Sequence, residues 1–467
     1  MKFCDIFDFY NKIKGMKIAF IGIGVSHREL IKICAENGAL VTLCDKRNLD
    51  DIKEKDELMS LGVKFKTGPD YLKNVDADIV FRTPGMYFLS PALDEIKKSG
   101  AMITSEMELF FEFCPCKIYA ITGSDGKTTT SNVIATMLKQ SGKTVHLGGN
   151  LGRALLPICH SIKKDDVAVV ELSSFQLISM RKSADVAVIT NLSPNHLDVH
   201  HDMQEYIDSK KNIFIHQNSS QRLVLNLDNE ETYKMRTLSK GSVNFFSYAN
   251  KAHFIESDFD GAFLDENGDI FLKSGSSIEK IMHKSLIKIP GEHNVENYLT
   301  AISAVGNEVG SEIVRQVAAT FSGVEHRIEY VKEVNGVKFY NDSIASSPTR
   351  TIAGLKSFSQ KLILIAGGYD KNLSYAPLAP IIKENVKLLI TMGNTADKIE
   401  TAVKDDTSPL ALPEIIRVND MNEAVKTALI KSQSGDIVIL SPASASFDKY
   451  RNFEERGRHF KDIVNAL

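Results

Sequence analysis

A glycine-containing turn at residues 122–130 (TGSDGKTTT) has the residue types and spacing needed to hold phosphate groups. An apolar strand is expected at 117–121, and a helix from Thr128 to about residue 141. Glycines let backbone N–H groups approach an anion closely, and a helix N-terminus favours negative charge. Lys127 can bring its ammonium group to the outer phosphates, and the Thr128 hydroxyl can bind Mg²⁺. The turn therefore predicts a nucleoside-triphosphate site.

The spacing of the glycines leaves one alternative open. Two residues separate Gly123 from Gly126, whereas the usual P-loop has four. A glycine-rich turn that merely precedes a helix carrying Lys-Thr would have the same sequence.

Two further strand ends carry side chains that suit this chemistry. Glu171 ends the apolar strand 167–172, and a carboxylate beside a phosphate loop suits Mg²⁺. A helix-capping or solvated glutamate is the alternative. His196 follows the next strand, 186–192, and is a candidate metal or substrate contact, whereas the neighbouring His200 and His201 are expected to be solvated.

The elements that must position these residues alternate between strand and helix in three tandem segments. Such alternation predicts parallel sheets covered by helices, and ligand sites in clefts between them. We expect an N-terminal Rossmann-like domain (1–113), a central P-loop ATPase-like α/β domain (114–322) with a small antiparallel sheet, and a C-terminal Rossmann-like α/β domain (323–467). The expected strands include 17–21, 39–44, 77–81, 101–104, 222–227, 337–342, 361–368, 387–393, 414–418 and 436–442, and short antiparallel strands are expected at about 240–285.

The turn Gly22-Ile23-Gly24 after the first strand suggests a dinucleotide fingerprint, but His27 stands where its third glycine should be. The turn could instead hold a nucleotide diphosphate. Asp45 and Arg47, which end the second strand, would then lie near the same crevice, as would the loop Thr83-Pro84-Gly85.

Bulk properties exclude several classes of function. The net charge of −3 gives no electrostatic basis for binding nucleic acid or an anionic membrane. No apolar run approaches the ~20 residues needed to span a bilayer, and the first residues lack a signal-peptide core. Six scattered cysteines, including Cys114 and Cys116, are expected to be reduced thiols in or near cores. A cytoplasmic protein is expected.

The motifs together resemble the Mur ligases, ATP-dependent amide-forming enzymes of peptidoglycan precursor synthesis. The resemblance covers nearly the whole chain, in order. Within the family, ELSSFQL and the C-terminal SPASAS and NFEERG favour the member that adds D-glutamate. The motifs are TGSDGKTTT, GGNLG, ELSSFQL, NLSPNHLD, IPGEHNVEN, GVEHR, YNDSIAS and SPASASFDKYRNFEERG.

The resemblance implies roles that the residues alone do not select. ATP would be held by Gly123, Ser124, Asp125, Gly126, Lys127, Thr128, Thr129, Asn294, Asn297, Arg327 and Asp342. Two Mg²⁺ ions would be bound by Thr128, Glu171, His196 and Lys210, the last as a CO₂-derived carbamate; by pattern alone, the pair Lys210-Lys211 is a solvated helix face. The catalytic set would be Lys127, His196 and Lys210. The UDP substrate would contact Val25, Ser26, Asp45, Arg47, Gly85 and Asn150, and D-glutamate would contact Ser346, Lys371, Ser446 and Phe453.

The implied reaction joins D-glutamate to UDP-N-acetylmuramoyl-L-alanine in two steps, in a cytoplasmic monomer with no nucleic-acid or membrane partner. The alanine carboxylate attacks the γ-phosphate to give an acyl phosphate and ADP, and the amine then displaces phosphate. Mg²⁺ and Lys127 would neutralise the developing charge, and the three domains would position the reactants.

Some positions depart from the commoner family pattern. Ile344 stands where many relatives carry lysine, Ser346 replaces a more usual threonine, and His27 and Arg28 alter the turn on the UDP side. These differences bear on substrate contacts more than on the reaction.

Three other functions remain as alternatives at this point. A related ligase could add glutamate to a folate, although ELSSFQL and the C-terminal motif fit it poorly. A nicotinamide-dependent oxidoreductase could use the first domain, although the missing third glycine weighs against it. A non-catalytic module could bind ATP without forming an amide.

Overall fold

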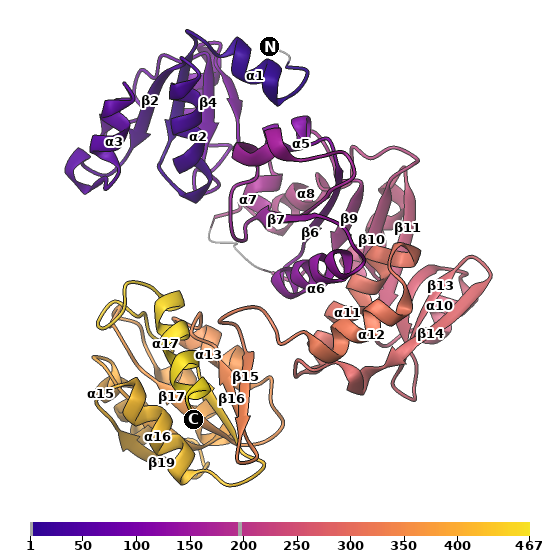
Figure 1. Ribbon diagram of the computed structural model, residues 1–467, viewed down its shortest axis with the longest axis vertical. Helices are drawn as coiled ribbons and strands as arrows, with labels where there is room; N and C mark the ends of the chain where they lie inside the picture. Colours follow the sequence, from indigo (N-terminus) through magenta and orange to yellow (C-terminus); the bar gives the residue numbers. More distant parts are fainter. Residues whose placement is uncertain (1–2, 195–198) are drawn as a thin grey trace. The chain divides into compact units, whose positions relative to one another are not determined.

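The computed structural model describes residues 3–194 and 199–467 and contains three sheets with helices between their strands (Figure 1). Contacts divide the chain into two compact units. Unit 1 comprises residues 1–286 and 295–317, and unit 2 comprises 287–294 and 318–467. Within the described ranges, no helix combines the length and apolar character needed to cross a membrane.

The first sheet of unit 1 is parallel throughout, with strand order β3-β2-β1-β4-β5. Phe20 and Phe81 stack on neighbouring strands with ring centroids 4.7 Å apart. The helix α2 begins at Val25, directly after the glycine turn, with Gly24 as its N-cap residue. The elements are α1 (Ile6–Lys12), β1 (Lys17–Ile21), α2 (Val25–Glu36), β2 (Leu40–Asp45), η1 (Leu49–Asp51), α3 (Lys55–Ser60), β3 (Lys64–Thr67), β4 (Ile79–Arg82), α4 (Pro91–Lys98), β5 (Met102–Thr104) and α5 (Glu106–Phe113).

The second sheet has nine strands in the order β14-β13-β12-β11-β10-β9-β6-β8-β7. Its first five strands along the chain are β6 (Lys117–Thr122), β7 (Val145–Gly149), β8 (Val167–Glu171), β9 (Val186–Ile189) and β10 (Arg222–Asn226), of which β7 lies at the edge of the sheet. The helices and turns around it are α6 (Lys127–Gln140), η2 (Leu156–Ser161), α7 (Ser174–Leu177), α8 (Met203–Lys211), α9 (Glu230–Lys234), η3 (Met235–Leu238), α10 (Lys251–Glu256), η4 (Lys284–Leu286), α11 (Glu292–Val305), η5 (Gly306–Glu308) and α12 (Ser311–Thr320).

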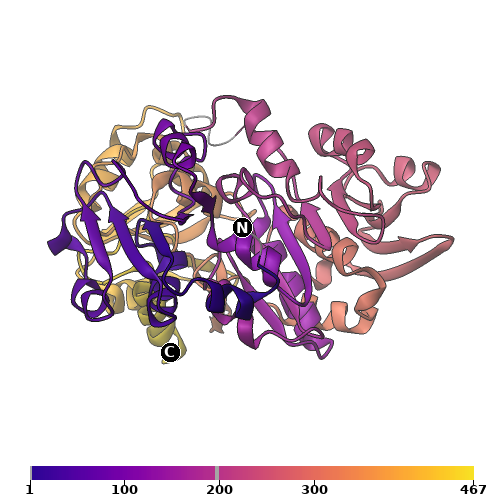
Figure 2. The ribbon, with the colours of Figure 1, turned by 90° about the horizontal axis from the view of Figure 1, so that it is seen from above.

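The region expected to form a small antiparallel sheet is instead an extension of this sheet. β11 (Ser242–Ser247) and β12 (Asp260–Leu264) continue it in parallel. β13 (Asp269–Ser274) pairs antiparallel with both β12 and β14 (Ser277–His283), and the β13–β14 hairpin forms the outer edge of the sheet (Figure 2). Antiparallel strands are thus present where they were expected, but they extend the central sheet, and the expectation that they form a small sheet of their own was wrong. The helix α10 between β11 and β12 provides the crossover that a parallel pair requires.

Unit 2 contains a six-stranded sheet with order β15-β16-β20-β17-β18-β19, in which only β15 is antiparallel to its neighbour. Alternate residues of β17 pack into two different cores: Ile363 and Ile365 into one, Leu362 and Leu364 into the other. Burial on both faces explains its continuous apolar run. The elements are β15 (Glu329–Val334), β16 (Val337–Asn341), α13 (Pro348–Leu355), β17 (Leu362–Ala366), η6 (Ala376–Leu378), α14 (Ala379–Asn385), β18 (Val386–Thr391), α15 (Ala396–Asp405), β19 (Glu414–Arg417), α16 (Met421–Lys431), β20 (Ile437–Leu440) and α17 (Phe453–Asn465).

Candidate active site

The predicted phosphate loop joins the carboxyl end of β6 to the N-terminus of α6. Gly126 is the N-cap residue of this helix and has φ +78°, and Gly123 has φ +147°. A Cβ atom on Gly123 would lie 1.9 Å from Oγ1 of Thr190, and one on Gly126 would lie 2.5 Å from Oδ1 of Asn297. Both positions therefore require glycine, and the N-terminus of a 14-residue helix favours the binding of an anion.

Side chains from the following strand and helix hold the loop in shape. Oγ of Ser124 donates to the Ser193 carbonyl at 3.0 Å and hydrogen-bonds the Tyr206 hydroxyl at 2.9 Å. The Asp125 N–H donates to Oδ1 of Asn191 at 2.9 Å, and Oγ1 of Thr190 donates to the Asp125 carbonyl at 2.6 Å. These bonds preorganise the loop for a ligand.

Lys127 reaches back over the loop that it follows. Its Nζ atom donates to the carbonyl oxygens of Gly123 and Ser124, each at 2.9 Å. The ammonium group is thereby fixed at the anion-binding end of α6, as its predicted role requires. Thr129, also predicted for ATP, is half-buried in the first turn of that helix.

A buried carboxylate lies beside the loop. Glu171, the last residue of β8, is 2% exposed. Its Oε2 atom accepts from Oγ1 of Thr128 at 2.7 Å, and its Oε1 atom accepts from Nδ2 of Asn150 at 2.9 Å. A carboxylate and a hydroxyl oxygen in contact fit Mg²⁺, which takes one or two protein oxygens and fills its shell with phosphate and water.

The Asn150 contact adds a role that the sequence did not predict. Asn150 was expected to contact the UDP substrate, and the structure shows its side chain donating a hydrogen bond to Glu171. Its backbone N–H also donates to the Glu171 carbonyl.

Among the described residues there is no group of three His, Cys, Asp or Glu side chains that could hold a metal by themselves. His196 lies outside the described residues.

Lys210 is buried on the inner face of α8, contrary to the solvated face that its Lys-Lys pattern predicts. It is 2% exposed, and its Nζ atom donates to Oγ1 of Thr122 at 3.0 Å and to the Gly123 carbonyl at 2.9 Å. Burial, with the nearby Lys127 charge, holds the pKa of Lys210 well below its ordinary value of 10.5. Lys211, about 100° further round the helix, pairs with Asp208. Burial thus favours the neutral, nucleophilic form of the Lys210 amine more than it would be favoured in an exposed lysine.

His200 was expected to be solvated, and that expectation was wrong. The ring is buried and stacks on Phe175 with centroids 5.0 Å apart. Its nitrogens hydrogen-bond Oγ of Ser174 and Oε1 of Glu205, both at 2.8 Å, and Oε2 of Glu205 accepts from the Tyr87 hydroxyl at 2.7 Å. This network links ELSSFQL to the loop after β4. No local pattern predicted this network, because two adjacent histidines before a helix carry no periodicity.

Two residues of ELSSFQL, Ser173 and Gln176, have a local structural role at the start of a helix. Oγ of Ser173 accepts from the Gln176 N–H, and Oε1 of Gln176 accepts from the Ser173 N–H. This capping box starts the short helix α7 and fixes the chain that leaves Glu171.

The candidates for UDP binding gather at the carboxyl edge of the first sheet. Asp45 accepts hydrogen bonds from the Ile23 N–H and from Nε, Nη2 and the backbone N–H of Arg47. The Arg47 guanidinium lowers the pKa of Asp45 to about 2. Thr83 contacts the same turn, since a Cβ atom on Gly22 would lie 3.3 Å from its Cγ2 atom. Val25 and Ser26 begin α2, and Gly85 is exposed in the loop after β4.

His27 explains how the glycine turn does without its third glycine. The ring is buried, and its Nδ1 atom lies 2.9 Å from the Gly22 carbonyl. Burial lowers the pKa of His27 to about 4, so the imidazole is neutral at physiological pH. The side chain braces the turn from inside and leaves its outer surface open.

In unit 2, loops after β16, β17 and β20 meet at the carboxyl edge of the sheet. Arg456 joins two of them, donating to the carbonyls of Ser343, Ser444 and Ala445 at 2.8 to 3.0 Å. Tyr369 joins the third, because its N–H donates to the Ala445 carbonyl. Arg456 belongs to the NFEERG motif, but sequence reasoning did not select it as a functional residue. Its side chain is buried, and burial lowers its pKa to about 10.

The candidates for D-glutamate binding lie on these loops in different environments. Ser446 is buried, and Ser346 is half-buried after β16. Lys371 is exposed, with Nζ 6.0 Å from the Phe447 ring centroid. Phe453 is half-buried against His326, with centroids 6.0 Å apart, so it contributes to local packing as well.

The candidates for nucleotide contacts are divided between the two units. Asn297, in unit 1, is buried against the phosphate loop and accepts from Oγ1 of Thr130 at 3.2 Å. Asn294 and Arg327 belong to unit 2, where Nδ2 of Asn294 donates to the Pro290 carbonyl at 2.6 Å. Asp342, also in unit 2, accepts from Oγ of Ser441 at 2.7 Å.

Asp342 should make the stability of the protein depend on pH. Burial raises its pKa from 3.8 to about 7. The folded state therefore binds more protons between these values, so the free energy of unfolding falls as the pH rises, by at most about 1.4 kcal/mol per pH unit. Asp342→Asn removes this titration. We measure the free energy of unfolding with denaturant and compare the variant with the parent. The difference, variant minus parent, should be larger at about pH 7 than at about pH 4 by roughly 3 kcal/mol.

The control for this prediction is Asp405→Asn, at the exposed last residue of α15. Its stability should follow that of the parent at every pH. If the Asp342→Asn and parent curves stay parallel, the carboxyl group does not carry the raised pKa.

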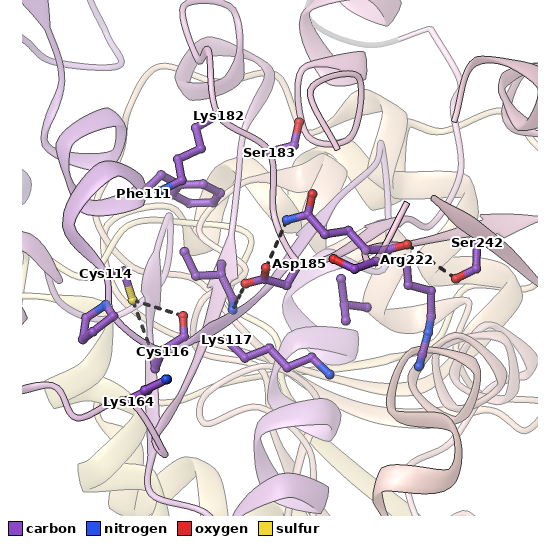
Figure 3. A pocket seen from close by; sticks show the side chains of 15 residues that line it. Phe111, Cys114, Cys116, Lys117, Lys164, Lys182, Ser183, Asp185, Arg222 and Ser242 are labelled. Carbon is purple, nitrogen blue, oxygen red and sulfur yellow. Dashed lines mark hydrogen bonds between the residues drawn. The ribbon is translucent and has the colours of Figure 1, made fainter. Parts of the chain in front are cut away.

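Two cavities in unit 1 lie apart from the candidate residues. One, of about 480 Å³, is lined by residues at the amino ends of β6, β9 and β10, including Lys117, Asp185 and Arg222 (Figure 3). The other, of about 540 Å³, is lined by residues from α5 and the loop after α7, including Glu108 and Arg181. The phosphate loop leaves the opposite end of β6, so neither cavity is part of the site described above.

Comparison with known proteins agrees with this arrangement. The family model described as "Mur ligase middle domain" matches residues 121–305, and the one described as "Mur ligase, glutamate ligase domain" matches residues 326–444. The chain is 50% identical over 467 residues to the UDP-N-acetylmuramoylalanine–D-glutamate ligase of Acetivibrio thermocellus, covering 98% of each chain. It is 46% identical over 464 residues to the ligase of the same name from Ruminiclostridium cellulolyticum, again covering 98% of each.

Solved structures share the fold at lower identity. The UDP-N-acetylmuramate–alanine ligase of Thermotoga maritima has a TM-score of 0.56 at 18% identity, covering 97% of this chain and 99% of that one. A pseudomurein peptide ligase of Methanothermus fervidus has a TM-score of 0.53 at 20% identity, covering 97% and 100%. Full-length identity of this degree, with the motifs in order on an α/β scaffold of largely parallel sheets, shows that the chain belongs to the Mur ligase family.

Proposed function

We propose that this chain is an ATP-dependent ligase that adds D-glutamate to UDP-N-acetylmuramoyl-L-alanine in peptidoglycan precursor synthesis. The observation that carries the proposal is the full-length identity to ligases of that name, joined to a preorganised phosphate loop with Lys127 and Glu171 beside it. The alanine carboxylate would attack the γ-phosphate, and the amine of D-glutamate would displace phosphate from the resulting acyl phosphate.

The residues of the central segment would bring two anions together. The N–H groups of Gly126, Lys127 and Thr128 would hold the phosphates, and the Lys127 ammonium would offset charge on the transferred group. Thr128 and Glu171 would hold one Mg²⁺; His196 and a carbamate on Lys210 would hold a second. Bound Mg²⁺ would supply the remaining positive charge. A carbamate replaces a cation, which repels Mg²⁺, with an anionic oxygen ligand.

The other segments would hold the two substrates. We assign residues 1–113 to the UDP substrate, 114–322 to ATP and 323–467 to D-glutamate. Asp45, Arg47 and the loop at Gly85 support the first assignment, because they meet at one sheet edge. Ser346, Lys371, Ser446 and Phe453 support the last: their loops share an edge whose shape Arg456 maintains. Lys371 would pair with a glutamate carboxylate and Ser446 would donate to it. The enzyme would act as a cytoplasmic monomer.

An ADP-release assay tests this function directly. We expect ADP to appear with UDP-N-acetylmuramoyl-L-alanine and D-glutamate, and far more slowly with L-glutamate, L-alanine or a diamino acid, because the amino-acid site must select both configuration and charge. Mass spectrometry of the product should show the amide. ADP release with a folate and L-glutamate instead would identify the related folate ligase. ATP binding without amide formation would identify a non-catalytic module.

A further inference from the structure

Cys114 and Cys116 form a dithiol pair in the segment between α5 and β6. Their sulfur atoms lie 3.5 Å apart, and both residues are free thiols. Cys114 is half-buried, whereas Cys116 is 5% exposed. Neither residue belongs to a helix or strand, so small backbone adjustments can bring the sulfurs to the bonding distance of about 2 Å without breaking a sheet.

The two thiols differ in character. The hydrogen bond between the two thiols lowers the pKa of Cys114, and the Lys182 charge acts in the same direction. The same contact, with burial, raises the pKa of Cys116. Burial also raises the pKa of Cys44 to about 11 and that of Cys159 to about 12. Since the thiolate is the nucleophile, Cys114 is favoured over these cysteines as an attacking group.

The cavity of about 480 Å³ gives this pair access to a small molecule (Figure 3). Its charged lining is mainly cationic. Glu308 offsets the charges of Lys117 and Arg222, because its Oε1 atom lies 2.7 Å from Nζ of Lys117 and 3.8 Å from Nη2 of Arg222. Asp185 is engaged by the Ile118 N–H and the Gln221 amide. The exposed Lys164 and Lys182 therefore favour an anionic ligand.

We propose that Cys114 and Cys116 are a thiol–disulfide exchange site that accepts an anionic low-molecular-weight disulfide through this cavity. The Cys114 thiolate attacks one sulfur of the disulfide, forms a mixed disulfide and expels the other half as a thiolate, which takes up a proton. Cys116 then loses its proton and attacks the Cys114 sulfur, and the second half leaves as a thiol. Two electrons pass from the protein to the small disulfide, which becomes two thiols.

The site is independent of the ligase chemistry. It lies at the amino end of β6, whereas the phosphate loop leaves the carboxyl end of that strand. The proposal can therefore fail or succeed whatever the outcome of the ADP-release assay.

The experiment uses the full chain carrying Cys4→Ser, because Cys4 is exposed and would form adducts of its own. Folded protein is treated with oxidised glutathione, and intact mass and peptide mapping follow the product. We expect the peptide that contains Cys114 and Cys116 to lose the mass of two hydrogens, as a disulfide between them requires, and to carry no lasting adduct. In the Cys4→Ser/Cys116→Ser protein, a glutathione adduct should remain on Cys114. In the Cys4→Ser/Cys114→Ser protein, reaction should be at least about tenfold slower.

The charge of the cavity is tested with cystamine, a cationic disulfide, as the comparison reagent. For each protein we take the ratio of the reaction rate with oxidised glutathione to the rate with cystamine. This ratio should be higher for the parent than for a Lys164→Met/Lys182→Met protein. Circular dichroism before and after treatment verifies that each variant stays folded. A lasting adduct on Cys114 while Cys116 is present would overturn the proposal, as would reaction of either thiol only after denaturation.

Discussion

Lys127→Ala is expected to lower the rate of ADP release by about a hundredfold or more, with little change in stability. The Lys127 ammonium is held over the phosphate loop by two carbonyl oxygens of that loop. In the proposed mechanism, its charge would then lie where the transferred phosphoryl group gains negative charge. Alanine keeps the helix, since it has the highest helix propensity, but removes the charge. The measurement is steady-state ADP release with both substrates, alongside the unfolding temperature.

Lys139→Ala provides the matched control. Lys139 lies on the same helix but is exposed in its last turn. The same substitution there should leave ADP release unchanged. Normal turnover by the Lys127→Ala protein would remove the assignment of this loop as the ATP site.

The second large effect is expected for Lys210→Arg, which should abolish amide formation. Burial lowers the pKa of Lys210 well below its ordinary value, and in the proposed mechanism its amine would add CO₂ to form a carbamate. Arginine stays protonated, cannot form a carbamate, and brings a fixed positive charge to a site proposed to hold Mg²⁺. Amide formation should fall to background. The parent supplied with ¹³C-labelled bicarbonate should show a carbamate carbon signal by NMR that the variant lacks.

Lys211→Arg is the control, one position along the same helix. Lys211 is paired with Asp208 rather than with the loop, so this variant should keep both the activity and the carbamate signal. Near-normal turnover by the Lys210→Arg protein would refute the carbamate role, even if the NMR signal is seen in the parent.

The sequence alone determined those features that depend on local order. The apolar runs of β1, β8 and β17 identified strands correctly, because burial on both faces leaves no polar position to interrupt them. Gly123 and Gly126 predicted the tight turn between β6 and α6, because only glycine fits that backbone and that contact with Thr190 and Asn297; its role as a phosphate loop stays a prediction. The strands β3, β7 and β15 were not predicted. β3 and β15 are only partly buried, and β7 carries two glycines, so their patterns are weak.

Tertiary structure decided which of several similar side chains is buried beside the candidate site. Lys210 and Lys211 are chemically identical neighbours, and only the docking of α8 against the phosphate loop buries one and leaves the other paired at the surface. His200 became part of a hydrogen-bonded network in the same way, through packing on Phe175. Residues far apart in the chain set desolvation and the nearby charges, so no local pattern encodes a lowered lysine pKa or a thiol pair beside a cavity.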